Sequence, residues 1–181
     1  ARQSSCASNL KQIALAHLQY LQDYDERFLY GWHVYSCSST WEGFLVPYVM
    51  NNQIFACPSG PGWTTYSDSG NYGWMYDELH GAKLATLSQA GDVSRYYLCF
   101  DSYSSYVTND DLDGNATANE WSDMTASLGA DRTDKYAAWR HNDGANVAFC
   151  DGHVKWVKRE EMLSRPTADY REPWYMNFAD I

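Results

Sequence analysis

The sequence predicts an α+β fold in which a long N-terminal α-helix packs against an antiparallel β-sheet. Three observations support this class: an amphipathic pattern over residues 5–24, an aromatic and apolar segment at 94–101, and a hairpin pattern over 145–157. One helix followed by strands, without βαβ alternation, favours an antiparallel sheet. We expect one domain over residues 1–181, with the helix at 1–26.

The N-terminal segment at 5–24 has apolar side chains at three- and four-residue spacing, as expected for a helix with one buried side. Charged and amide side chains fall largely on the other side, and no Gly or Pro interrupts the pattern. The apolar side consists of Leu10, Ile13, Ala14, His17, Leu18, Tyr20, Leu21 and Tyr24.

The middle of the chain has strong turn signals and few regular patterns. Pro47 forces a break or a helix start, and the CPSGPG sequence at 57–62 ends a short apolar run. Residues 60–73 are rich in Gly, Ser, Thr and Tyr, and we interpret them as a surface loop. Residues 82–89 fit a short helix or an irregular edge.

The C-terminal third contains the strongest hairpin signal. Asp151 and Gly152 lie between two apolar runs, and an Asp-Gly pair in that position favours a tight turn. The predicted strands are 145–150 and 153–157. Residues 158–163 fit a short helix.

Composition restricts the class of partner. The net charge is −10, which disfavours nucleic acid and anionic membranes. No run reaches the ~18 apolar residues of a membrane-spanning helix, and there is no signal-peptide core, so the chain as given is expected to be a soluble monomer. The 15 Tyr and 8 Trp fit a carbohydrate-binding face, or tyrosine-rich strands and interfaces, which we favour.

Five cysteines lie far apart in the sequence and form no Cys-x-x-Cys pair, which disfavours zinc ribbons. Their spacing fits one or two disulfides in an oxidising compartment. Cys37 and Cys57 are the disulfide candidates, closing a loop of about twenty residues. Cys99 and Cys150 are expected to be neighbours, bonded or buried together. Cys6 is the predicted unpaired thiol.

A calcium loop is predicted at 109–120, inside a long polar insertion at 102–134. A hard cation needs six to eight oxygen ligands, and a tight loop directs alternate side chains inward around a glycine, here Gly114. Asn at the first position and Ala116 at the eighth depart from the usual pattern. The alternative is a solvated acidic turn. The predicted ligands are Asn109, Asp111, Asp113, Asn115, Thr117 and Glu120.

A second cluster of polar residues surrounds the predicted hairpin: His141, Asp143, Asp151 and His153. Such residues can ligate a transition metal or act as acid and base. Turn aspartates usually bond the backbone instead, so we favour a structural interpretation. No nucleophile elbow, phosphate loop or dinucleotide motif accompanies them, and the catalytic hypothesis has no specific support.

Two stretches together resemble bacterial type IV pilin-like proteins. The sequence CASNLKQI at 6–13, continued by YLQDY at 20–24, is similar to the segment after the membrane-spanning half of their first helix. His141, nine residues, and then Asp151-Gly152 match the C-terminal H-x9-DG motif of a pseudopilin-like group. The CPS sequence at 57–59 also occurs in that group.

The resemblance implies a filament subunit of a type IV pilus or a type II secretion pseudopilus, with a long helix and a globular head. It would be exported and would assemble with copies of itself or with other pilin-like subunits. A leader and about 20 apolar residues would then precede Ala1. Calcium in the heads of some pseudopilins supports calcium at 109–120.

No catalytic role follows from the resemblance, so a non-enzymatic function is expected. The first alternative is a surface-displayed carbohydrate-binding or adhesive module that uses exposed Trp and Tyr. The second is a metal-dependent enzyme that uses His141 and Asp151.

Overall fold

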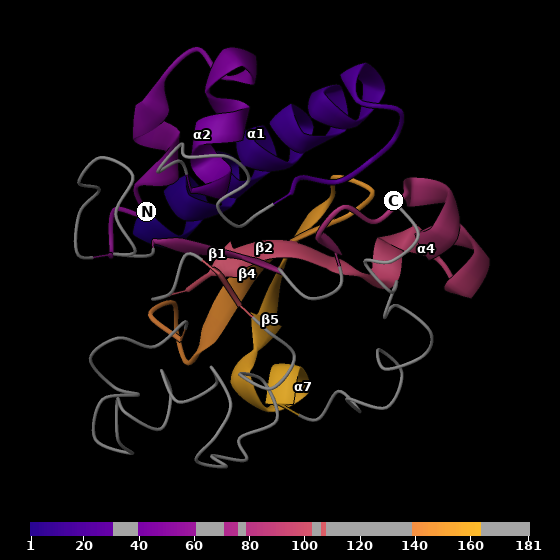
Figure 1. Cartoon of the computed structure of the whole chain (residues 1–181). Coiled ribbons are helices and arrows are strands. Elements are labelled where there is room, and N and C mark those ends of the chain that lie inside the picture. Colours follow the sequence, from indigo (N-terminus) through magenta and orange to yellow (C-terminus); the bar gives the residue numbers. More distant parts are fainter. Residues whose placement is uncertain (31–39, 61–70, 76–78, 103–105, 108–138, 164–181) are drawn as a thin grey trace, which may run out of the picture.

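The computed structural model describes residues 1–30, 40–60, 71–75, 79–102, 106–107 and 139–163. Within this part, helix α1 (Arg2–Asp23) lies across one face of a five-stranded sheet, with the short helix α2 (Trp41–Leu45) beside it (Figure 1). The predicted α+β class is therefore confirmed.

Helix α1 forms because its apolar side chains repeat on one side. The buried residues are Cys6, Leu10, Ile13, Ala14, Ala16, His17, Tyr20 and Leu21. The helix ends at Asp23, earlier than the predicted 26, because Asp25 and Glu26 adopt positive φ values of 51° and 54°. Tyr24 stacks on Tyr20 but stays 53% exposed.

The sheet has the order β3-β1-β2-β4-β5. Its strands are β1 (Tyr72–Met75), β2 (Tyr97–Asp101), β3 (Tyr106–Val107), β4 (Gly144–Phe149) and β5 (Val154–Lys158). Neighbours among β1, β2, β4 and β5 pair antiparallel, as predicted. Strand β3, which falls in the segment predicted as a polar insertion, pairs parallel with β1.

The predicted hairpin is confirmed as β4 and β5, with Gly144 opposite Lys158 and Ala148 opposite Val154. The turn before β4 places Asn142 and Asp143 at φ values of 55° and 57°. Asn and Asp tolerate this left-handed region better than other non-glycine residues. The predicted short helix is α7 (Arg159–Leu163).

Strand β1 corrects the surface-loop interpretation of residues 60–73 at its end, residues 72–73, whereas residues 61–70 lie outside the described part of the chain. All four of its residues are buried, and it lies between β2 and β3. Two-sided burial removes the alternation of apolar and polar side chains that identifies a half-exposed strand.

The remaining elements are short helical turns: η1 (Val46–Tyr48), η2 (Asn52–Phe55), α4 (Leu84–Ala90) and η3 (Val93–Arg95). Pro47 lies at the start of η1, and α4 confirms the helical alternative for residues 82–89. Among the described helices, none combines the length and apolar character needed to cross a bilayer.

Candidate functional site: a buried cysteine, histidine and aspartate cluster

Four buried residues meet beneath the N-terminal part of α1, and we call them the buried cluster. Cys6 comes from α1, Cys57 follows η2, Asp101 ends β2 and His141 precedes β4. Their sulfur, nitrogen and oxygen ligand atoms all lie within 4.8 Å of one another. None of the four is more than 4% exposed, so the cluster is a core feature.

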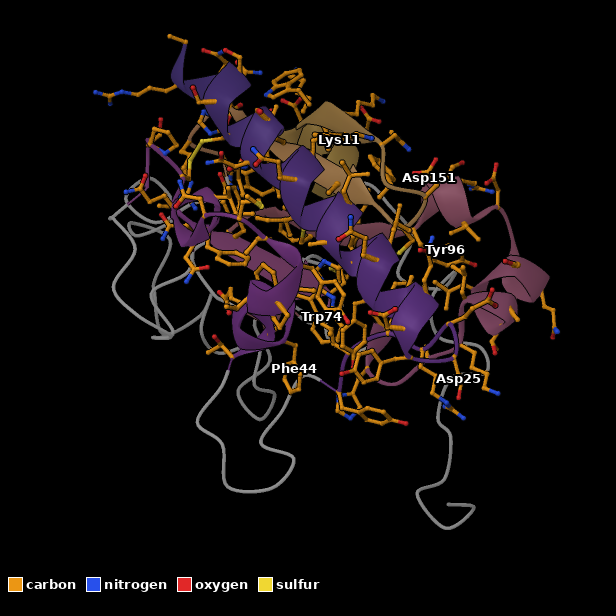
Figure 2. All side chains as sticks on the ribbon, turned by 90° about the horizontal axis from the view of Figure 1, so that it is seen from above. Lys11, Asp25, Phe44, Trp74, Tyr96 and Asp151 are labelled. Carbon is orange, nitrogen blue, oxygen red and sulfur yellow. A yellow bond between two sulfur atoms is a disulfide. The ribbon has the colours of Figure 1, made fainter. Side chains whose placement is uncertain are left out.

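Cys6 and Cys57 form a disulfide, visible as the yellow bond in Figure 2. The predicted pairing of Cys57 with Cys37 is therefore wrong. The prediction that Cys6 is the unpaired thiol is wrong as well. Their Cα atoms are 5.3 Å apart although 51 residues separate them, because α1 lies directly against η2. Cys37 lies outside the described residues.

Cys99 and Cys150 are buried as thiols rather than bonded to each other, so the part of the prediction that buries them is confirmed. Burial, then the nearby Asp101 and Glu42 carboxylates, raise the pKa of the Cys99 thiol. A thiol held neutral in this way is a poor nucleophile and a poor metal ligand.

His141 connects the disulfide to Asp101. Its Nε2 lies 3.4 Å from Cys57 Sγ and 3.5 Å from Asp101 Oδ2. The His141 carbonyl accepts a hydrogen bond of 2.8 Å from Trp156 Nε1, and the His141 amide donates to Gly144 O. The ring is therefore held from the backbone side while its Nε2 faces sulfur and carboxylate. While Cys57 remains in the disulfide, its sulfur is not a nucleophile.

Within the described residues, one oxygen of the Asp101 carboxylate accepts hydrogen bonds and the other does not. Its Oδ2 accepts hydrogen bonds from the Asn146 amide at 2.8 Å and from Asn146 Nδ2 at 2.9 Å. Its Oδ1 is buried and has no hydrogen-bond partner within the described residues. A buried carboxylate oxygen without a partner is costly.

Arg140 supplies the compensating positive charge. Its guanidinium donates to the carbonyls of Asn71, at 3.1 Å, and Ser102. Burial lowers the Arg140 pKa, and the Asp101 carboxylate opposes that shift. Asn71 Oδ1 also accepts from the Cys57 amide at 3.2 Å. The same side chains thus fix the ends of β1 and β2 and the segment that carries Cys57.

The other half of the H-x9-DG motif lies at the opposite end of β4, where the chain turns beneath the middle of α1. Gly152 has φ +87°, and its carbonyl accepts a 2.7 Å hydrogen bond from Lys11 Nζ. Figure 2 shows Lys11 on the side of α1 that faces the Asp151 turn. A Cβ on Gly152 would lie 2.8 Å from Leu18 Cδ1. The backbone conformation therefore favours glycine, and a side chain here would also displace the end of the Leu18 side chain.

The four residues of the predicted hairpin cluster do not converge. His141 is buried at one end of β4, whereas His153 is exposed at the other, with its Nδ1 2.6 Å from Asp151 Oδ1. Asp143 lies 3.9 Å from the Arg159 guanidinium on the surface. Asp151 Oδ1 also accepts from the His153 amide, the turn role expected of aspartate. This arrangement favours the structural interpretation of these four residues.

The predicted calcium ligands, Asn109, Asp111, Asp113, Asn115, Thr117 and Glu120, lie outside the described residues, and calcium binding remains a prediction. Of the described aromatic side chains, Tyr24 and Trp156 are the two that are markedly exposed, on different elements. Searches of protein-family models, curated proteins and solved structures found no match to this chain.

Proposed function

We propose that this chain is the exported globular part of a pilin-like filament subunit, with a structural rather than a catalytic function. The observation that carries the proposal is the division of α1 into two faces. One face is buried from Cys6 to Leu21, against the sheet and against the short helical turns beside it. The other face is open to solvent and suited to contact with another helix.

The open face of α1 carries an uncharged stripe, consisting of Gln12, Leu15, Gln19 and Gln22. These residues recur at three- and four-residue intervals, so they lie along one line of the helix. Leu15 is 44% exposed although leucine is normally buried. Identical helices can pack through such a stripe without repulsion between like charges.

The anchoring of α1 fits the same function, because a filament helix must transmit force to its head. A disulfide holds the helix near its first turns, and the turn after β4 holds its middle through Lys11 and Leu18. The H-x9-DG motif contributes to both attachments, through His141 at one end of β4 and Gly152 at the other.

Site-specific crosslinking of the native full-length protein in its own cells tests the proposal. Leu15→Cys, with a thiol-specific bifunctional reagent of short reach, should give a ladder of covalent multimers in material sheared from the cells. Lys155→Cys is the matched control, because Lys155 is also exposed but lies on β5. It should give markedly less multimer.

Equal crosslinking at the two positions would contradict a filament built through α1. Recovery of Leu15→Cys protein only as monomer would also contradict it. If purified protein instead bound a glycan through Tyr24 or Trp156, the carbohydrate-binding alternative would replace the filament proposal.

The filament proposal requires an anchor before Ala1. We expect the gene to encode a short basic leader and about 20 apolar residues there, enough to cross the ~30 Å hydrocarbon core. A glutamate near the start of that segment would match pilin-like proteins. Finding an ordinary cleavable signal peptide or another folded domain immediately upstream would overturn the proposal.

Calcium stabilisation of the head is the second part of the proposal, carried by the ligand pattern at 109–120. Titration of chelator-treated protein should reveal one calcium site, and calcium should raise the melting temperature by preferential binding to the folded state. Glu120→Gln should weaken binding strongly, because a closing carboxylate is lost. Identical melting of stripped and calcium-loaded protein would contradict the site.

A further inference from the structure

We propose that the buried cluster is a redox-gated metal site, which binds one Zn²⁺ when the Cys6–Cys57 disulfide is reduced. The ligands would be Cys6 Sγ, Cys57 Sγ, His141 Nε2 and Asp101 Oδ1. Zinc favours tetrahedral sets of sulfur, nitrogen and carboxylate oxygen. The structure brings these donor types together from four separate elements in the core.

The spacing of the donor atoms fits zinc. A tetrahedral site with normal zinc–ligand bonds has edges of about 3.4–3.8 Å between its ligand atoms. Nε2 of His141 lies 3.4 Å from Cys57 Sγ and 3.5 Å from Asp101 Oδ2, and the proposed ligand Oδ1 is the other oxygen of that carboxylate. One donor atom of each of the four residues lies within 4.8 Å of the other three, so side-chain movement completes the set once the two sulfurs part.

The state of Asp101 is a second, independent observation. Asn146 holds Oδ2 with two hydrogen bonds, which fixes the orientation of the carboxylate. Oδ1 is fully buried and, within the described part of the chain, accepts no hydrogen bond. An oriented carboxylate with one unsatisfied oxygen is the arrangement that a metal ligand needs, because outer partners hold the ligand in place.

Charge balance also favours the site. Two thiolates, one carboxylate and Zn²⁺ together carry a net charge of about −1. The positively charged Arg140 guanidinium next to Asp101 balances that charge.

The chemistry of gating is a two-electron exchange. A dithiol reductant supplies two electrons and two protons to the Cys6–Cys57 bond and is itself oxidised to a disulfide. The two protein thiols then lose their protons as Zn²⁺ binds. A disulfide oxidant would accept two electrons from the two thiolates and, with two protons, become a dithiol, which re-forms the Cys6–Cys57 bond and releases the metal. The disulfide and the zinc complex therefore exclude each other.

Metal binding by the reduced full chain tests this proposal. Protein reduced with a dithiol and desalted without oxygen should bind one Zn²⁺ in competition with a chromophoric chelator, and the oxidised protein should bind none there. Co²⁺ in place of zinc should give the intense visible bands of a tetrahedral ion and the near-ultraviolet band of two thiolate ligands. Zinc should also raise the melting temperature of the reduced protein only.

Variants separate the cluster from adventitious binding. Asp101→Asn and His141→Gln should each weaken zinc binding by at least tenfold, whereas His153→Gln, which removes an exposed histidine, should not change it. If a ligand variant fails to fold, the cobalt spectrum of the reduced wild-type chain still shows whether the two cysteines bind the metal. Absence of the thiolate band, or equal zinc binding by oxidised and reduced protein, would overturn the proposal.

Discussion

The two ends of β4 hold α1 by different physical means. At the His141 end, a disulfide and buried polar side chains join four elements far apart in the sequence. At the Gly152 end, a single tight turn contacts the helix through its backbone carbonyl and through its lack of a side chain. The first attachment depends on long-range tertiary contacts, whereas the second depends on local turn geometry. The two should therefore respond to different perturbations.

Loss of the disulfide should have the largest effect. Cys6→Ala with Cys57→Ala frees a loop whose ends are 51 residues apart. Chain entropy alone then lowers the free energy of unfolding by about 4 kcal/mol. Urea denaturation of the double variant and of the oxidised wild type measures the difference. A loss below about 1 kcal/mol would mean that packing, rather than the crosslink, fixes the N-terminal part of α1.

Acid should loosen the middle of α1, where His17 is buried. Burial lowers the pKa of His17 to about 4, partly offset by its hydrogen bond to Ile13 O. The unfolded chain binds this proton near pH 6.5, so neutral His17 supports folding fully above that pH. Stability falls as the pH drops from about 6.5 to 4 and then levels off, by about 3 kcal/mol from this group.

The His17 effect is checked by urea denaturation at several pH values. His17→Leu should reduce the loss of stability between pH 6.5 and 4, and His153→Gln, at an exposed histidine, is the control. An unchanged pH dependence in His17→Leu would assign the acid sensitivity to carboxylates instead.

Adding one methyl group at the Gly152 end of β4 should lower the free energy of unfolding moderately. Gly152→Ala places a side chain at φ +87° and against Leu18, and we expect a loss of about 2 kcal/mol. The double variant with Leu18→Ala separates the two causes. If the cost of Gly152→Ala stays the same in that background, the backbone conformation is responsible. A neutral Gly152→Ala would show that this end of β4 tolerates rearrangement.

The smallest expected effect is that of Lys11→Met, which keeps the aliphatic stem and removes the donor to Gly152 O. A partly buried hydrogen bond of this kind contributes about 1 kcal/mol. Thermal denaturation should detect the loss, with Gln12→Met on the exposed face as the matched control. A loss in Lys11→Met no larger than that of the control would mean that the turn is held by Leu18 packing alone.

Local sequence determined the elements whose patterns are complete within a few residues. The apolar repeat of α1, the Asp-Gly turn between β4 and β5 and the short helix α7 were predictable, because side-chain period and turn chemistry act over short distances. Helix α4 was one of two alternatives that the sequence left open. Strand β1 was missed because burial on both faces removes the alternation that marks a strand.

Only the tertiary structure shows that the four residues of the buried cluster lie together. Cys6, Cys57, Asp101 and His141 have no spacing typical of a metal or disulfide motif, and their juxtaposition depends on how α1 packs across the ends of β2 and β4. The wrong disulfide prediction has the same cause. Cys37 is nearer to Cys57 in the sequence, but the packing of α1 places Cys6 next to Cys57. A core is formed by long-range contacts, and those contacts leave little trace in local sequence spacing.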